Sequence, residues 1–215
     1  MSLSQIRARL IQLNGWLETA RPAAQMWVFA ATGALLTSIL FFITRPAVEA
    51  HESRRLLATL HELMPETPWT PSDLGAAVEF PIPGPGHHRL TLYPLREGNH
   101  FKGVFLKTST PEGYSGDIEF AMAVRPDGHI IGVRVLRHRE TPGLGDWIEI
   151  TRSDWVLDFS GKSLDDLPDS RWRVQKDGGA FDQFTGATIT PRAVVKGVHD
   201  TLKLLKTHGE IRQEP

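Results

Sequence analysis

The chain has 215 residues, no cysteine and a formal net charge of −1 at pH 7. This length allows one domain with a substantial core, and the near-neutral charge gives no general reason to expect nucleic acid or a strongly acidic partner. The lack of cysteine excludes cysteine-ligated iron–sulfur clusters, thiolate zinc sites, thiol nucleophiles, disulfides and CxxCH haem attachment. Any redox chemistry must therefore use a cofactor held by other groups.

An apolar segment near the N-terminus predicts a transmembrane helix. Residues 22–44 carry no ionisable side chain, and a helix needs about 20 apolar residues to cross about 30 Å of hydrocarbon. A buried core helix would usually keep a polar face. A cleaved signal peptide, for which Val48 and Ala50 could form the cleavage site, would have an apolar region of only roughly 7–15 residues. We therefore expect a retained membrane helix at 24–44, preceded by a cytoplasmic leader at 1–23.

The charges beside this segment leave its orientation open. Residues 1–44 have a net charge of +2 and the remainder has −3, but basic residues lie close to both ends of the segment, so the positive-inside count is nearly a tie. Ala30, Ala34 and Ser38 recur every four residues. This spacing would let a second membrane helix approach closely, although alanine and glycine are also simply common in such helices.

Residues 45–88 are predicted to form a connecting helix and loop. The helix is indicated by leucines at near-helical spacing and is ended by three prolines: Leu56, Leu57, Leu60 and Leu63, then Pro65, Pro68 and Pro71. The sequence PIPGPGHH at 81–88 is rich in turn-forming residues and predicts a loop.

Residues 89–209 are predicted to form a single α+β domain, followed by a C-terminal tail at 210–215. Asp127-Gly128 between two apolar runs is a strong hairpin signal. We expect a sheet flanked by helices, with strands at 90–95, 101–108, 118–124 and 130–138 and helical segments at 153–159 and 191–209.

Just before the last predicted helix, Thr185-Gly186-Ala187-Thr188 forms a candidate anion site. Thr190 is predicted to be the N-cap and Pro191 the first helical residue. Small residues at a helix N-terminus bring several N–H groups together, and these donors favour a phosphate. The loop lacks the GK[ST] of a nucleoside-triphosphate P-loop. Taken alone, such a loop is more often a cap and a turn.

Four segments together resemble a known family. The sequence FDQFTGATIT resembles the D-x-x-[ST]-G-A-[ST] pattern of proteins that carry covalent FMN. The sequences GYSGDIEFAMAV, HRETPGLGDWIE and SDWVLDFSGKSL precede it in the order found in the G subunit of Rnf-type electron transport complexes. That family is related to the C subunit of the sodium-pumping NADH:quinone oxidoreductase. The chain is identified as a member of this FMN-binding family.

The resemblance implies that FMN is covalently attached to Thr188 as a phosphoester. Thr185, Gly186 and Ala187 would shape the loop that binds the cofactor. Asp182 would belong to the motif that the attaching flavin transferase recognises. A threonine hydroxyl can form a phosphoester, and a helix N-terminus would stabilise the remaining phosphodiester charge.

The ETPGLG loop is the second part of the expected site. By itself it indicates a turn with special backbone angles. The resemblance places it beside the flavin, where Gly143 and Gly145 would let the backbone approach the ring and Glu140 and Thr141 would bond to ring or ribityl oxygens. Leu144 would cover the apolar face of the ring.

Nearby residues are expected to serve the structure. The GYSG turn at 113–116 opens a strand pair, and Trp155 and Phe159 have the i, i+4 spacing of a core pair. Lys176 lies beside Asp177, which offers it a competing partner, so we expect a solvated surface lysine. The nine histidines form no metal-site pattern, and no Ser/His/Asp set or carboxylate pair indicates hydrolysis.

The leading hypothesis is a membrane-anchored flavoprotein that relays electrons within an Rnf-type complex, which couples exchange between NADH and ferredoxin to ion translocation. The resemblance places it in the bacterial inner membrane, with its domain on the periplasmic side and the other subunits as partners. It lacks GxGxxG after a strand, so it has no apparent NADH site and is an electron-transfer subunit rather than an independent catalyst. A flavin-free assembly subunit and a membrane-anchored flavin sensor are the alternatives.

Overall fold

A computed structural model describes residues 3–74, 77–82, 89–98 and 100–208. The chain divides into two compact units with a boundary between Glu52 and Ser53. Most of the predicted loop at 81–88, the predicted helix end at Gly209 and the tail at 210–215 lie outside the described residues.

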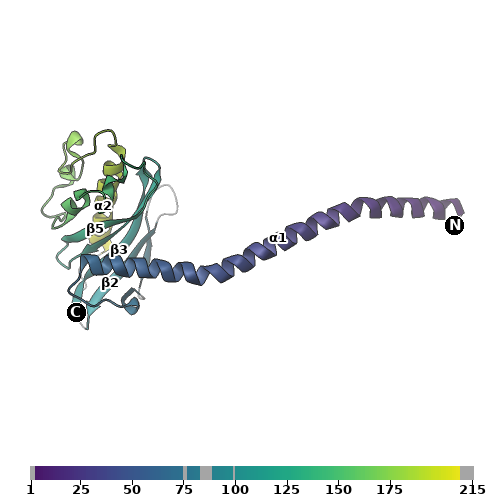
Figure 1. Cartoon of the computed structure of the whole chain (residues 1–215), viewed down its shortest axis with the longest axis horizontal. Coiled ribbons are helices and arrows are strands. Elements are labelled where there is room, and N and C mark those ends of the chain that lie inside the picture. The colour runs from purple at the N-terminus through teal and green to yellow at the C-terminus, as the bar shows by residue number, and fades with distance from the viewer. Residues whose placement is uncertain (1–2, 75–76, 83–88, 99, 209–215) are drawn as a thin grey trace. The chain divides into compact units, whose positions relative to one another are not determined.

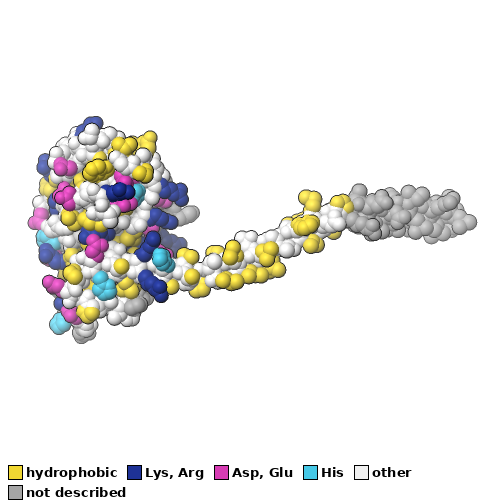
Figure 2. Space-filling view, in the orientation of Figure 1, with side chains coloured by type: hydrophobic (Ala, Val, Ile, Leu, Met, Phe, Trp, Pro, Cys, Tyr) yellow, Lys and Arg dark blue, Asp and Glu magenta, His cyan; other side chains and the backbone are white. Residues whose placement is uncertain are grey.

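The first unit consists of the long helix α1, Leu3–Leu63, up to Glu52. Within α1, Ala24–Leu63 contains a window with a mean hydropathy of 2.0 and no buried part, so this helix is long and apolar enough to cross a membrane. Figure 2 shows its exposed apolar side chains, which include Trp27 and Phe29 at 77% and 78% exposure.

The hydroxyl groups of this apolar helix bond to its own backbone. Four of them donate to the carbonyl four residues earlier at 2.8 Å, namely those of Thr32, Thr37, Ser38 and Thr44. Hydrocarbon offers polar groups no partner, so this internal bonding suits a helix placed in lipid.

The second unit contains a five-stranded antiparallel sheet with the strand order β1-β2-β3-β4-β5 (Figure 1). Its strands are β1 Val78–Pro81, β2 Arg89–Glu97, β3 His100–Gly113, β4 Gly116–Val124 and β5 Ile130–Arg137. The four predicted strands are confirmed. β1 was not predicted, because Pro81 and the turn-forming residues after it weaken the strand signal. This proline is tolerated at the end of an edge strand, where it pairs with Arg89.

Two tight hairpins set the register of the central strands. The predicted turn at Asp127-Gly128 is confirmed, with Gly128 at φ +86° and the Gly128 N–H donating to the carbonyl of Arg125 at 2.9 Å. The GYSG turn joins β3 to β4, with Gly116 at φ +116°. A Cβ on Gly113 would lie 2.2 Å from the carbonyl oxygen of Gly116, so this turn requires glycine.

Helix α2, Ile189–His208, packs on one face of the sheet, and the last turns of α1 pack on the other. Successive strand residues point to opposite faces, so Leu106 belongs to the α2-side core and Phe105 to the α1-side core. The α1-side core also contains Leu60 and Leu63, and α1 ends before Pro65 as predicted.

Short 3₁₀ helices supply the remaining regular structure. They are η1 Pro71–Leu74, η2 Asp146–Ile148, η3 Trp155–Phe159, η4 Asp169–Arg171 and η5 Gln175–Asp177. The helix expected at 153–159 is therefore a single 3₁₀ segment, with Trp155 and Phe159 directed into the α2-side core. The predicted α+β class and the sheet flanked by helices are confirmed.

Candidate functional site

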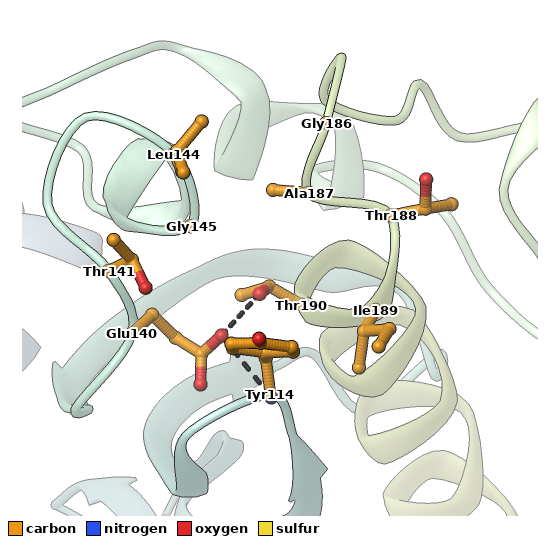
Figure 3. A pocket seen from close by; sticks show the side chains of 10 residues that line it. All are labelled: Tyr114, Glu140, Thr141, Leu144, Gly145, Gly186, Ala187, Thr188, Ile189 and Thr190. Carbon is orange, nitrogen blue, oxygen red and sulfur yellow. Dashed lines mark hydrogen bonds between the residues drawn. The ribbon is translucent and has the colours of Figure 1, made fainter.

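Three segments of the second unit form a pocket of about 220 Å³ (Figure 3). They are the β3–β4 turn, the loop after β5 and the loop that leads into α2. The lining residues are Tyr114, Glu140, Thr141, Leu144, Gly145, Gly186, Ala187, Thr188, Ile189 and Thr190. Seven of the ten predicted site residues are among them, whereas Asp182, Gly143 and Thr185 are not.

Thr188 is the N-cap of α2. The N–H of Arg192 donates to the Thr188 carbonyl at 3.3 Å, which makes this carbonyl the first acceptor of the helix. Among the described residues, the Thr188 hydroxyl has no hydrogen-bond partner and the N–H groups of Ile189 and Thr190 have no acceptor. The pocket therefore offers a half-buried free hydroxyl beside the donor-rich end of a helix.

The prediction that Thr190 caps α2 is wrong. The helix begins at Ile189, so Thr190 lies within the first turn and Pro191 is not its first residue. The Thr190 hydroxyl donates to Glu140 Oε2, a residue 50 positions earlier in the sequence. This long-range contact, which local sequence cannot reveal, replaces the predicted cap.

Glu140 connects the three segments of the pocket. Its side chain accepts hydrogen bonds from the Thr190 hydroxyl, from the N–H of Ser115 at 2.9 Å and from the N–H of Tyr114 at 3.3 Å. Only 4% of Glu140 is exposed. Its carboxylate thus holds the β3–β4 turn and the first turn of α2 in place, and it is committed to these protein donors.

Glycines allow the close approach of these segments. A Cβ on Gly145 would lie 2.9 Å from Glu140 Cβ and 3.0 Å from Thr190 Oγ1. Gly186 has φ +82° in the tight turn that brings the Ala187 N–H to the Phe184 carbonyl at 3.2 Å. A side chain at Gly145 would displace a wall of the pocket, and one at Gly186 would strain the backbone of the turn.

The three predicted residues outside the lining lie in the same two loops. The Gly143 N–H donates to Asp146 Oδ1 at 2.7 Å, and Thr185 is exposed in the turn before Gly186. The side chain of Asp182 is exposed, while its carbonyl accepts a hydrogen bond from Trp155 Nε1 at 2.9 Å.

Trp155 and Phe159 support this loop from the core. Their rings meet edge to face with centroids 5.5 Å apart, and the ring centroids of Trp155 and Phe184 lie 5.3 Å apart. Because both residues are buried, their predicted core role is confirmed. The segment before Thr188 is therefore held by aromatic packing as well as by hydrogen bonds.

Charged groups flank the start of α2. Arg192 Nε lies 2.5 Å from Asp177 Oδ2, and this hydrogen bond holds the pKa of Asp177 below its ordinary value. Lys176 is exposed beside this pair, in agreement with a surface lysine. Within the described ranges, no group of three or more His, Asp or Glu residues could hold a metal ion.

Residues 113–203, which contain all three pocket segments, match the FMN-binding domain family. The G subunit of an ion-translocating oxidoreductase complex from Pseudomonas aeruginosa is 41% identical over 194 residues, covering 88% of this chain and 90% of the relative. The corresponding protein of Cereibacter sphaeroides is 41% identical over 84% of this chain and 81% of its own. That of Vibrio vulnificus is 35% identical over 85% and 87%.

The chain belongs to the family of ion-translocating oxidoreductase complex G subunits. The family that the sequence motifs indicate is thereby confirmed. In this protein the pocket fits the chemistry of FMN, since apolar side chains of Tyr114, Leu144 and Ile189 line it beside the free hydroxyl of Thr188. An aromatic ring system needs such apolar walls, and a phosphate needs donors.

Three lining residues of the pocket were not predicted as site residues. Ile189 and Thr190 follow the TGAT motif directly, so their position next to it was an available signal. Tyr114 was expected only to shape a turn. It does so through its N–H, but its side chain, which is 69% exposed, also lines the pocket.

Proposed function

We propose that this protein carries FMN in a phosphoester linkage to Thr188 and relays electrons within its complex. The observation that carries the proposal is the free hydroxyl of Thr188, which lies at the N-terminus of α2 and lines an apolar-walled pocket. No other threonine that lines this pocket combines these features, since Thr190 is bonded to Glu140 and Thr141 lies away from the helix N-terminus.

The attachment joins the Thr188 oxygen to the phosphorus of FMN. The hydroxyl loses its proton and the phosphate loses one hydroxyl group, so the product has the mass of the chain plus FMN minus one water. One negative charge remains on the phosphodiester. The unpaired N–H groups of Ile189 and Thr190 and the positive end of α2 would stabilise this charge.

The positions of the other site residues suggest their roles in binding FMN. Leu144 and Tyr114 would cover the ring system, and the Thr141 hydroxyl would bond to ring or ribityl oxygens. Thr185, Gly186 and Ala187 would shape the loop that admits the phosphate, and the flavin transferase would recognise the exposed Asp182. Gly143 and Gly145 would keep the second loop close to the cofactor. FMN supplies the ability to accept and release electrons.

The relatives are named as subunits of ion-translocating oxidoreductase complexes. We therefore place this chain in such a complex, where electron exchange between NADH and ferredoxin is coupled to ion translocation. Residues 24–44 would span the inner membrane after a cytoplasmic leader at 1–23. The segment 45–88 would lead to the FMN-binding domain at 89–209 on the periplasmic side, with 210–215 as a tail.

The test is the mass of the intact chain after expression with a flavin transferase. The wild type should gain the mass of FMN minus water and should fluoresce in a denaturing gel. Thr188→Ala should lose both signals. Thr207→Ala, which removes an exposed hydroxyl from the other end of the same helix, is the matched control and should keep both. An unmodified wild type under these conditions would leave a flavin-free assembly subunit as the better interpretation.

A further inference from the structure

The carboxylate of Glu140 lies in the wall of the pocket without a neighbouring cation. Its three hydrogen-bond donors are two backbone N–H groups and one hydroxyl, and all three are uncharged. Among the described residues, no Lys, Arg or His nitrogen comes within 4.0 Å of its oxygens. Glu140 is also buried, so water screens its charge poorly.

Other carboxylates of the surrounding loops lie beside basic side chains. Asp146, which is also buried, has Arg152 Nε at 3.4 Å. Glu149 Oε1 lies 2.6 Å from His138 Nε2. Glu140 is thus the carboxylate that faces the pocket, and its hydrogen bonds stabilise a negative charge without cancelling it.

Two glycines keep this carboxylate in position. A Cβ on Gly113 would lie 2.9 Å from Glu140 Oε1, and a Cβ on Gly145 would lie 2.9 Å from Glu140 Cβ. Because the carboxylate is enclosed from both sides, its charge acts on the pocket from a fixed place. A mobile, exposed glutamate would act more weakly.

We propose that the charge of Glu140 lowers the reduction potential of the FMN in this pocket. This inference rests on the proposed function and deepens it. Each electron that the isoalloxazine ring accepts from a reduced redox partner without a proton adds one negative charge to the ring. A fixed negative charge in the pocket wall raises the energy of that reduced form, so the oxidised form is favoured.

The main test is Glu140→Gln, which removes the charge and keeps nearly the same shape. The potential is measured by spectroelectrochemical titration of the FMN-loaded full chain in detergent. We expect a shift to more positive potential, with the equilibrium constant for accepting one electron increased at least about tenfold, or about 59 mV. Glu112→Gln, which removes an exposed carboxylate paired with Lys196, is the control and should leave the potential near that of the wild type.

Thr190→Val separates the charge from the hydrogen bonds around it. This variant keeps the carboxylate and removes the O–H dipole whose positive end partly offsets its charge, so the pocket becomes more negative and the potential should fall. If Glu140→Gln does not fold, Thr190→Val decides: a lower potential supports the inference, whereas an unchanged or higher one overturns it. A rise in both variants would also overturn it, because loss of geometry rather than of charge would be responsible.

The mass of each chain is measured before its potential, so the two proposals can fail separately. A wild type without FMN would overturn both. An FMN-loaded Glu140→Gln variant with the potential of the wild type would overturn the role of Glu140 and leave the attachment at Thr188 standing.

Discussion

The two faces of the sheet are both apolar, but they support different structures. On the α1 side, Leu56, Leu60 and Leu63 of one helix pack against strand residues. On the α2 side, buried aromatic rings from the irregular segments between β5 and α2 are added to the helix contacts. Those rings fix segments that have little regular structure of their own. The α1-side face thus packs against the end of α1, while the α2-side face supports the loops that form the pocket.

This contrast predicts that substitutions on the α2 side affect the pocket and those on the α1 side do not. The largest effect is expected for Phe159→Ala. The Phe159 side chain is fully buried, stacks on Phe181 with centroids 4.7 Å apart and meets Trp155 at 5.5 Å. Its loss should lower the free energy of unfolding by about 3–5 kcal/mol, as measured by urea titration of the detergent-solubilised chain, and should reduce FMN attachment. Full attachment despite this loss would show that the pocket does not depend on the aromatic packing.

Leu60→Ala tests the opposite face. Leu60 is fully buried in the α1-side core, so its truncation should lower the free energy of unfolding by about 2–5 kcal/mol. Because this face contributes no residue to the pocket, FMN attachment measured by intact mass should remain complete under conditions where the variant is folded. Equal loss of attachment in Leu60→Ala and Phe159→Ala would remove the proposed distinction between the faces.

The smallest effect is expected at the surface of the α2 side. The hydrogen bond from Arg192 holds the pKa of Asp177 below its ordinary value of 3.8. A lowered pKa contributes stability above the unfolded-state value, and this contribution disappears as the pH falls through the folded-state value. The difference in unfolding free energy between the wild type and Asp177→Asn should therefore be constant near neutral pH and shrink below about pH 4. Urea titrations at a series of pH values measure it, and a difference that grows in acid would contradict the assignment.

The sequence predicted the elements whose signals are local. Alternating apolar residues and the Asp127-Gly128 turn identified the central strands, and Thr190-Pro191 indicated the last helix, although its start was predicted two residues too late. Edge strand β1 was not predicted because Pro81 weakens the strand signal of this short segment. The sequence also brought together most of the residues that line the pocket, although their binding roles stay predictions.

The contacts of Glu140 and Thr190 could not be predicted in the same way. A threonine before proline at a helix start is a common cap, and only the folded chain brings the Thr190 hydroxyl to a carboxylate 50 residues away. Likewise, the role of Tyr114 depends on a hairpin that lies 26 residues from Glu140 in sequence. Sequence patterns report periodicity and local turns, whereas these contacts depend on tertiary packing.

The composition of the pocket has a consequence for the biogenesis of the protein. Its walls come from Tyr114, from residues 140–145 and from residues 186–190, so the last wall is synthesised after the entire sheet. Until α2 packs on the sheet, Glu140 lacks one of its donors and the pocket lacks one of its walls. If cofactor insertion requires the complete pocket, only those chains that have finished folding would therefore receive the cofactor.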